Sequence, residues 1–269
     1  MSINFLFLII SPYFWGEASG GEMYFLGIEN QVGYPLLVGL FFNLLEYYFT
    51  QKKKKITIYA LIHIISTFIV FSATTVVSVV IMYLFLLPNP ISSVFKKISF
   101  KTMLIYAGCL FSIVMFFSNI ETILENSILT NVIENLFQKS TTLSGRTLIW
   151  YIVLKKIGES PFLGYGVGET YNEFYVEGAY LSAHNTILQY LYWGGVMFYI
   201  SIIPIIGRFN TLLKKADSNF AHIFKCTTCA MLVAFMGEAV GIWEVIIIVM
   251  IGIVMSTTIF QKPQKERIK

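Results

Sequence analysis

Long runs of apolar residues, separated by short polar connections, follow one another along most of the chain. Most of these runs are long enough to cross a hydrocarbon core of ~30 Å as an α-helix. Seven of them lie near residues 33–49, 56–71, 74–88, 102–118, 184–206, 221–238 and 243–260, and a shorter stretch at 3–15 would make an eighth. The pattern predicts an all-α, polytopic integral membrane helix bundle with seven or eight transmembrane helices.

The runs at residues 56–71 and 74–88 are joined by a very short connection around Ser72 and Ala73, which is too short for an ordinary loop. Two interpretations fit this spacing: a tight helical hairpin, or one long tilted helix. The hairpin agrees better with the distribution of charged residues, so we expect the chain to turn back here.

Lysine and arginine residues orient the predicted bundle. Short basic connections at residues 52–55, 96–101 and 208–215 and a basic tail at 262–269 should face the cytoplasm, because cytoplasmic loops are enriched in cationic residues. Counting Lys225 with them, fifteen of the nineteen cationic residues lie on that side. The other four fall in one segment, which the alternation of spans places outside: Lys139, Arg146, Lys155 and Lys156.

This topology divides the chain into N-terminal transmembrane helices (1–118), a large extracytoplasmic loop (119–183), C-terminal transmembrane helices (184–260) and a cytoplasmic tail (261–269). Composition agrees with a membrane protein, since 56% of the residues are hydrophobic and only 13% are charged. One soluble core could not bury so much apolar surface. The net charge of +4 comes from scattered clusters beside the membrane, so it does not indicate a nucleic-acid partner.

The extracytoplasmic loop is expected to fold. Apolar residues recur at helical spacing over residues 120–137 and again over residues 146–157, where Ser160 and Pro161 end the second pattern. We therefore predict two amphipathic helices in this loop, with Arg146 in the first turn of the second one.

Three glycines follow at alternating positions, Gly164, Gly166 and Gly168. A glycine-rich segment can hold phosphate with its backbone N–H groups. A nucleotide-binding loop also needs a strand before the glycines and Lys-Ser/Thr after them, and this sequence indicates neither. The pattern favours turns, and direct contact of Gly166 with a substrate is the alternative.

Arg146 and His184 are the candidate reactive pair. A guanidinium can hold pyrophosphate oxygens through two parallel hydrogen bonds, and a neutral imidazole can take a proton from an attacking hydroxyl. The helix start beside Arg146 would add exposed backbone N–H groups for a phosphate. Each residue also has an ordinary explanation, because Arg146 could pair with lipid headgroups and His184 could cap or anchor the next helix. The surrounding motifs favour a functional role for both.

Several neighbours of this pair are secondary candidates. Lys155 and Lys156 could assist in binding a pyrophosphate. Trp150 is either an interfacial anchor or a platform for a sugar ring, and Asn185 either orients His184 or satisfies backbone groups. Five glutamates on the outer side could bind sugar hydroxyls or act as a second acid or base, and the sequence does not select among them: Glu169, Glu173, Glu177, Glu238 and Glu244.

The chain has a single aspartate, Asp217, on the predicted cytoplasmic side. It therefore has no pair of aspartates to hold a divalent metal and a nucleotide sugar, which argues against a nucleotide-sugar transferase and predicts no metal site. Cys226 and Cys229 have the spacing of a zinc or redox motif but no partner pair, so we predict helix packing for them. His63, in the middle of a span, is expected to be neutral and bonded to a neighbouring helix.

Three motifs, in this order, resemble those of the O-antigen ligase and O-antigen or capsule polymerase family of bacterial surface-polysaccharide proteins. They are Gly-Arg-x-x-x-Trp at 145–150, Pro-x-x-Gly-x-Gly-x-Gly at 161–168 and Ala-His-Asn at 183–185. The resemblance covers most of residues 25–260. The chain departs from the family in the tight hairpin, where members usually carry an arginine and this sequence has threonines at 74–75.

The resemblance implies a metal-independent inverting glycosyl transfer, without a cofactor, on the outer face of the bacterial inner membrane. The donor would be an undecaprenyl-pyrophosphate-linked oligosaccharide and the acceptor a glycan. The implied activity is polymerisation of repeat units into O antigen or capsule. Carried over by position, His184 is the base and Arg146 a pyrophosphate ligand. We further predict that Trp150, Asn185 and Gly166 contact the substrate.

The missing hairpin arginine either weakens pyrophosphate binding or moves that task to Lys155 or Lys156. One alternative is a ligase that transfers the glycan to a different acceptor, and another is a non-catalytic transporter or flippase of lipid-linked sugars. A transporter would show internal repeats and charged residues at mid-membrane positions, and the sequence shows no repeat and little such charge. A chain-length regulator and a flippase of the same pathway are the expected partners, and the C-terminus is expected in the cytoplasm.

Overall fold

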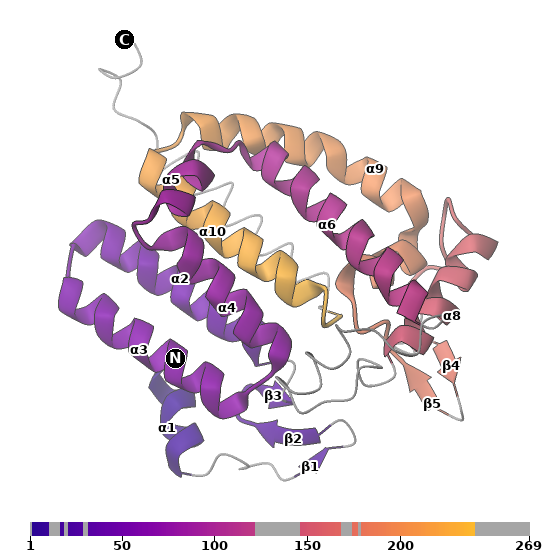
Figure 1. The fold of residues 1–269 in the computed structure, drawn as a ribbon, viewed down its shortest axis with the longest axis horizontal. Coiled ribbons are helices and arrows are strands. Elements are labelled where there is room, and N and C mark those ends of the chain that lie inside the picture. The colour runs from indigo at the N-terminus through magenta and orange to yellow at the C-terminus, as the bar shows by residue number, and fades with distance from the viewer. Residues whose placement is uncertain are drawn as a thin grey trace. The chain divides into compact units, whose positions relative to one another are not determined.

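The computed structural model describes residues 2–10, 17–18, 21–28, 32–121, 146–167, 174–176 and 179–239, and this part of the chain is mostly helical (Figure 1). Its helices are α1 (Ser2–Ile10), α2 (Gly33–Thr50), α3 (Lys53–Val70), α4 (Ala73–Leu86), α5 (Pro90–Lys97), α6 (Phe100–Glu121), α8 (Arg146–Glu159), α9 (Thr186–Lys215) and α10 (Ser218–Phe235). The predicted span at 243–260, and the predicted amphipathic helix at 120–137 apart from the end of α6, lie outside the described residues.

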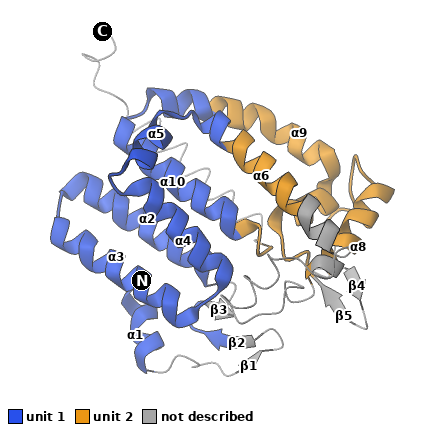
Figure 2. Cartoon of the chain, viewed as in Figure 1, with its two compact units in different colours: residues 1–103, 209–234, 245–269 blue, residues 104–208, 235–244 orange. Residues whose placement is uncertain are grey.

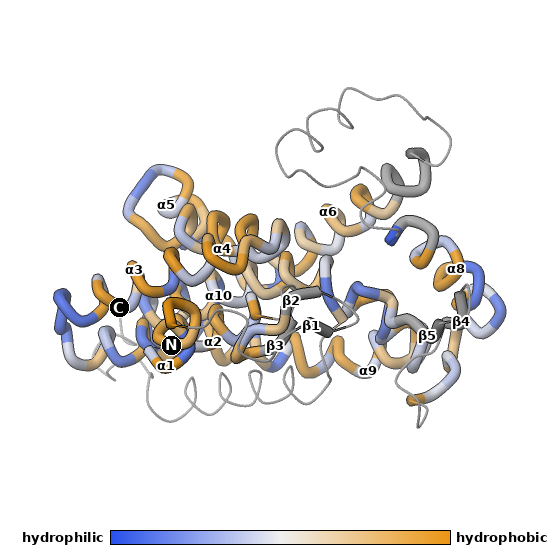
Figure 3. Tube along the Cα trace, turned by 90° about the horizontal axis from the view of Figure 1, so that it is seen from below, coloured by the Kyte–Doolittle hydropathy of each residue, from blue (hydrophilic) through white to orange (hydrophobic). Residues whose placement is uncertain are grey.

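The helical prediction is confirmed, because six predicted spans coincide with α2, α3, α4, α6, α9 and α10 to within a few residues at most ends. Among the described helices, α9 alone is long and apolar enough to cross a membrane by itself. Helices α4 and α5 are long and apolar enough for this only when taken together, and they are bent by 84° relative to each other. Hydrophobic residues dominate the helices and hydrophilic residues gather at connections (Figure 3). The number of spans, seven or eight, stays a prediction.

Short antiparallel strands add to the helices, and the sequence pattern did not predict them. The strands are β1 (Glu17–Ala18), β2 (Gly21–Tyr24) and β3 (Gly27–Ile28) in one sheet, and β4 (Phe174–Val176) and β5 (Ala179–Leu181) in another. Each has two to four residues, which is too few to show the alternation of apolar and polar positions that identifies a strand.

The chain falls into two compact units (Figure 2). The described residues of unit 1 fall within 1–103 and 209–234, and those of unit 2 within 104–208 and 235–239. Unit 2 therefore contains both motifs that carry the candidate chemistry, around Arg146 and His184. Its core consists of buried side chains from α6, α8, the start of α9 and the residue before His184: Met115, Ile149, Trp150, Val153, Ile157, Ala183 and Leu188.

The predicted helical hairpin is confirmed within unit 1. Helix α3 ends at Val70, its C-cap Phe71 adopts a left-handed conformation with φ 43°, and α4 begins at Ala73. The Tyr83 hydroxyl on α4 donates to the carbonyl of Ala60 on α3 at 3.4 Å and lies 3.3 Å from Nδ1 of His63. These contacts require the two helices to run antiparallel, and they show His63 bonded to a neighbouring helix as expected.

The threonines that replace the family's hairpin arginine include one that packs inside unit 1. Thr75 is 2% exposed, and a Cβ on Gly33 would overlap its side chain. Gly33 thus allows the first residue of α2 to approach the start of α4 closely. Thr75 fills space at this contact, so the position is closed to a large charged side chain.

Helix α9 is broken at Gly195, where φ is 58° and ψ is −162°. A helix break leaves backbone groups without their i→i−4 partners, and the glycine loop before it supplies replacements. The N–H groups of Tyr165 and Gly166 donate to the carbonyls of Tyr192 and Trp193 at 2.9 and 2.8 Å. In return, the carbonyls of residues 161–162 accept from the N–H groups of residues 196–197 at 2.8 and 3.1 Å.

The glycines of this loop adopt conformations that disfavour other residues. Gly164 and Gly166 have φ of 66° and 80°, which confirms the prediction of turns. A Cβ on Gly164 would also lie 2.6 Å from the carbonyl carbon of Trp193. The loop therefore docks backbone to backbone against the break, and it fixes α8 to the first part of α9.

Candidate active site

Unit 2 brings Arg146, His184 and Glu238 together. Arg146 Nη2 lies 3.3 Å from Glu238 Oε1, and His184 Nδ1 lies 3.6 Å from Glu238 Oε2. One carboxylate therefore faces the guanidinium with one oxygen and the imidazole with the other. The Arg146 and Glu238 side chains are 15% and 8% exposed, whereas that of His184 is 31% exposed. The imidazole is the most accessible member of the cluster.

Arg146 is the first residue of α8, as predicted. The face of α8 that carries Ile149, Val153 and Ile157 is buried, and this spacing of four residues places the three side chains on one side of the helix. Packing of this face fixes the axis of α8. The fixed axis in turn places the guanidinium beside Glu238.

His184 has a left-handed backbone, with φ 43°, which is uncommon for a residue with a side chain. The backbone of Ala183, the residue before it, is held at both its carbonyl and its N–H. The Trp150 indole N–H donates to the Ala183 carbonyl at 3.0 Å, and the Ala183 N–H donates to Oε1 of Gln189 at 2.8 Å. Both bonds are buried, and they stabilise a conformation that would otherwise be costly.

Asn185 is the N-cap of α9. Its side-chain oxygen accepts from the N–H groups of Ile187 and Leu188, each at 3.0 Å. Its side-chain N–H donates to the carbonyl of Met236 at 3.1 Å. Of the two roles considered for Asn185, satisfying backbone groups is the one that the structure supports, because this side chain is fully buried and its polar atoms are bonded to backbone.

Glu238 follows the end of α10 and is tied to the start of α9. The Thr186 hydroxyl donates to the Glu238 carbonyl at 2.6 Å, beside the bond from Asn185 to Met236. Of the five outer glutamates that the sequence left open, Glu238 is therefore the one placed at the candidate site. The other four, at 169, 173, 177 and 244, lie outside the described residues.

A family model described as O-antigen ligase matches residues 36–203, which is more than half of the 269 residues. The chain belongs to the O-antigen ligase family. Arg146 and His184 lie inside the matched range, and Glu238 lies beyond it. No curated protein and no solved structure matches the chain.

Membership of the O-antigen ligase family confirms the resemblance seen in the motifs at 145–185. Proteins of this family are bacterial inner-membrane enzymes of the glycosyltransferase kind. Their substrates are a lipid-linked oligosaccharide and a glycan acceptor. The site in unit 2 must therefore be considered against these two substrates.

Two residues predicted to bind substrate, Trp150 and Gly166, instead use their N–H groups to bond other parts of the protein. Trp150 is 4% exposed, and its indole N–H is used by Ala183, so it offers no open ring face to a sugar. The N–H of Gly166 is used by Trp193, so it cannot also donate to a phosphate. A substrate contact of Gly166 through another atom stays a prediction.

Lys155 and Lys156 are exposed near the other end of α8 from Arg146. They are nine and ten residues further along the helix, about 14 Å of helical rise. Lys156 Nζ bonds Glu159 at 2.8 Å, and the Tyr165 hydroxyl donates to the same carboxylate at 3.1 Å. Hydrogen bonding by Lys156, then by Tyr165, lowers the pKa of Glu159. The structure does not bring these lysines to the pair.

We expect Trp150→Phe to weaken the fold of unit 2 and the positioning of His184. The change keeps an aromatic ring but leaves the buried Ala183 carbonyl without its donor, which costs about 1–3 kcal/mol. Thermal unfolding of the purified protein in detergent should show a lower midpoint. Trp193→Phe, in the same unit, is the matched control, and an equal loss in that variant would contradict the role given to Trp150.

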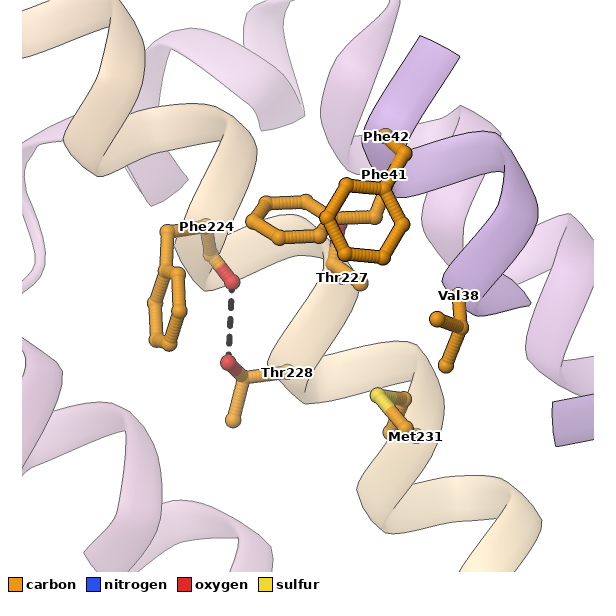
Figure 4. A pocket seen from close by; sticks show the side chains of 7 residues that line it. All are labelled: Val38, Phe41, Phe42, Phe224, Thr227, Thr228 and Met231. Carbon is orange, nitrogen blue, oxygen red and sulfur yellow. Dashed lines mark hydrogen bonds between the residues drawn. The ribbon is translucent and has the colours of Figure 1, made fainter. Parts of the chain in front are cut away.

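An apolar groove lies in unit 1, between α2 and α10 (Figure 4). Its lining consists of Val38, Phe41, Phe42, Phe224, Thr227, Thr228 and Met231. The Thr228 hydroxyl donates to the Phe224 carbonyl at 2.9 Å within α10. None of the described residues that line this groove is ionisable, so they cannot supply the base or the cation that sugar transfer requires.

Proposed function

We propose that this chain polymerises undecaprenyl-pyrophosphate-linked oligosaccharide repeat units by an inverting glycosyl transfer on the outer face of the membrane. The observation that carries the proposal is the meeting of Arg146 and His184 at one carboxylate, within a partly exposed site of unit 2. A cationic group for a leaving pyrophosphate and a base for an attacking hydroxyl are the two groups that this transfer needs.

In the proposed step, a hydroxyl of the acceptor sugar attacks the anomeric carbon of the donor glycan. A new C–O bond forms on one face while the bond from that carbon to the pyrophosphate oxygen breaks on the other, so the anomeric configuration inverts. The hydroxyl proton moves to His184. Undecaprenyl pyrophosphate leaves with the bonding electron pair, and no metal or cofactor takes part in this step.

Arg146 is assigned to the leaving group. A guanidinium has five N–H donors, so it can keep one contact with Glu238 and still present donors to phosphate oxygens. The N–H groups at the start of α8 add partial positive charge at the same place. Both groups stabilise negative charge that grows as the pyrophosphate departs, which lowers the barrier more than it stabilises the bound donor.

Ligation of the glycan to a different acceptor is the second candidate, and the description of the matched family favours it. Polymerase and ligase share the donor, the base and the cation, and they differ only in the molecule that supplies the attacking hydroxyl. The two activities can therefore be separated by their products and not by the residues of the site.

The experiment uses the full chain, purified and reconstituted in liposomes with a lipid-pyrophosphate oligosaccharide donor. We expect longer oligosaccharides that remain attached to the lipid carrier. Glycan transferred only to an added lipid acceptor would favour the ligase. Movement of intact donor across the bilayer without any new glycosidic bond would overturn both and indicate a transporter.

In the same assay, we expect Arg146→Ala to lower the turnover rate about 10²–10³-fold, because it removes the main electrostatic stabilisation of the leaving group. The matched control is Arg208→Ala, which removes an exposed arginine from the predicted cytoplasmic side. If both variants lose the same small amount of activity, Arg146 does not have the role proposed for it.

A further inference from the structure

We propose that Glu238 is a positioning residue that holds the His184 ring through Nδ1 and stabilises the imidazolium formed when His184 takes up the proton. This inference rests on the proposed function, because it assigns a partner to the proposed base. It concerns a residue outside the range of the family match, which ends at residue 203.

The orientation of the imidazole supports this role. His184 Nδ1 is buried and has no hydrogen-bond partner among the described residues, yet it faces Glu238 Oε2 at 3.6 Å. A proton on Nδ1 directed at the carboxylate leaves the lone pair on Nε2, at the other side of the ring. That tautomer is the one that can accept a proton from a hydroxyl, and a small approach of the two side chains completes the bond.

The charges of the cluster support it as well. When His184 becomes protonated, the site holds two cationic groups, the imidazolium and the guanidinium of Arg146. The Glu238 carboxylate lies against both, 3.3 Å from the guanidinium and 3.6 Å from the imidazole. Because Glu238 is only 8% exposed, water screens these interactions weakly. The carboxylate therefore offsets the repulsion that proton transfer would create.

The backbone of Glu238 is fixed independently of its charge. Its carbonyl accepts from the Thr186 hydroxyl at 2.6 Å, and the nearby Met236 carbonyl accepts from Asn185 at 3.1 Å. Both anchors come from the residues directly after His184. Replacement of the carboxylate by an amide of the same shape therefore leaves these anchors in place and changes only the charge and its hydrogen bonding.

The test is a double-mutant cycle in the reconstituted system, with Glu238→Gln, His184→Ala and the combination. We expect Glu238→Gln alone to lower kcat about 10²-fold without raising KM for the donor, because it removes the partner of the imidazolium while Arg146 remains able to bind pyrophosphate. In the His184→Ala background, the same change should lower kcat less than about threefold, since the residue through which it acts is gone.

Equal losses from Glu238→Gln in both backgrounds would overturn the inference, while a large loss in His184→Ala alone would still support the proposed function. If His184→Ala keeps full activity, both fail. Glu159→Gln is the matched control, since Glu159 also pairs with a cation in unit 2 but is 48% exposed, and it should keep near-normal kcat.

A second variant keeps the inference testable if Glu238→Gln does not fold. Thr186→Val preserves the carboxylate and the side-chain shape but removes the hydroxyl that anchors the Glu238 carbonyl. We expect it to lower kcat with little change in KM, and to lower it much less when His184 is already alanine. A loss of the same size in both backgrounds would again overturn the role of Glu238.

Discussion

His184→Ala is expected to lower kcat for glycosyl transfer about 10²–10⁴-fold, the usual contribution of a general base. Without the imidazole, the proton of the attacking hydroxyl must pass to water, which is a weaker base and is not held in place. Donor binding should change little, because Arg146 and the start of α8 remain. In a producing strain that depends on this chain, polymer length and abundance should fall together.

Rescue by added imidazole provides a chemical test of this role. Alanine leaves a space at a side chain that is 31% exposed, so added imidazole should enter and restore part of the rate in the purified system. His222→Gln is a suitable control, because His222 lies in unit 1 against Ser92 and takes no part in the proposed step. Normal polymer in cells carrying His184→Ala, with the protein present at its usual level, would sink the assignment of His184 as the base.

Gly195→Ala is expected to abolish the folded protein. A Cβ at this position would overlap the carbonyl group of Phe162, and the residue has φ 58°, a conformation that L side chains rarely adopt. Strain and overlap act together on backbone atoms that have no room to move. We expect the free energy of unfolding to fall by more than about 4 kcal/mol, a loss typical of severe backbone and packing defects.

The amount of monodisperse protein after detergent extraction measures this effect. The matched control is Gly207→Ala in the same helix, since a Cβ at Gly207 meets no other atom within 4 Å. That variant should fold normally, because alanine also has a higher helix propensity than glycine. Normal yields of Gly195→Ala would mean that α9 can run unbroken and that the loop at 161–166 does not depend on the break.

The helices could be predicted because their signal is local. Each of α2, α3, α4, α6, α9 and α10 is marked by a run of apolar residues, and the ends of such a run coincide with polar or turn-forming residues. The hairpin at residues 71–73 was also predictable, since two long apolar runs cannot share so short a connection without a turn or a tilt.

The break in α9 had a weaker signal. Gly194 and Gly195 are adjacent within an apolar run, which marks a point where a helix can be interrupted. Hydropathy does not register the interruption, because the residues on both sides are apolar. The partners that satisfy the broken backbone come from residues 161–166, and only the folded structure shows this pairing.

The candidate site was predictable in part. The motifs identified Arg146 and His184 as chemical groups, but they are 38 residues apart and nothing local places them at one point. Glu238 follows His184 by another 54 residues. It is one of five glutamates on the predicted outer side, and no feature of the sequence distinguishes it from the other four. The sequence left two interpretations each for Trp150 and Asn185. Both side chains are buried, and a buried polar group must bond to what surrounds it, which only the folded structure can show.

The loop at residues 161–166 is relevant to the synthesis of the chain as well as to its folded structure. Within a bilayer, each backbone group that α9 gives up at Gly195 would cost several kcal/mol if it met only lipid. The four bonds from the loop remove that cost, and synthesis from the N-terminus delivers the loop before α9. The bonding partners at residues 161–166 therefore exist before the backbone groups of residues 192–197 that they satisfy are made.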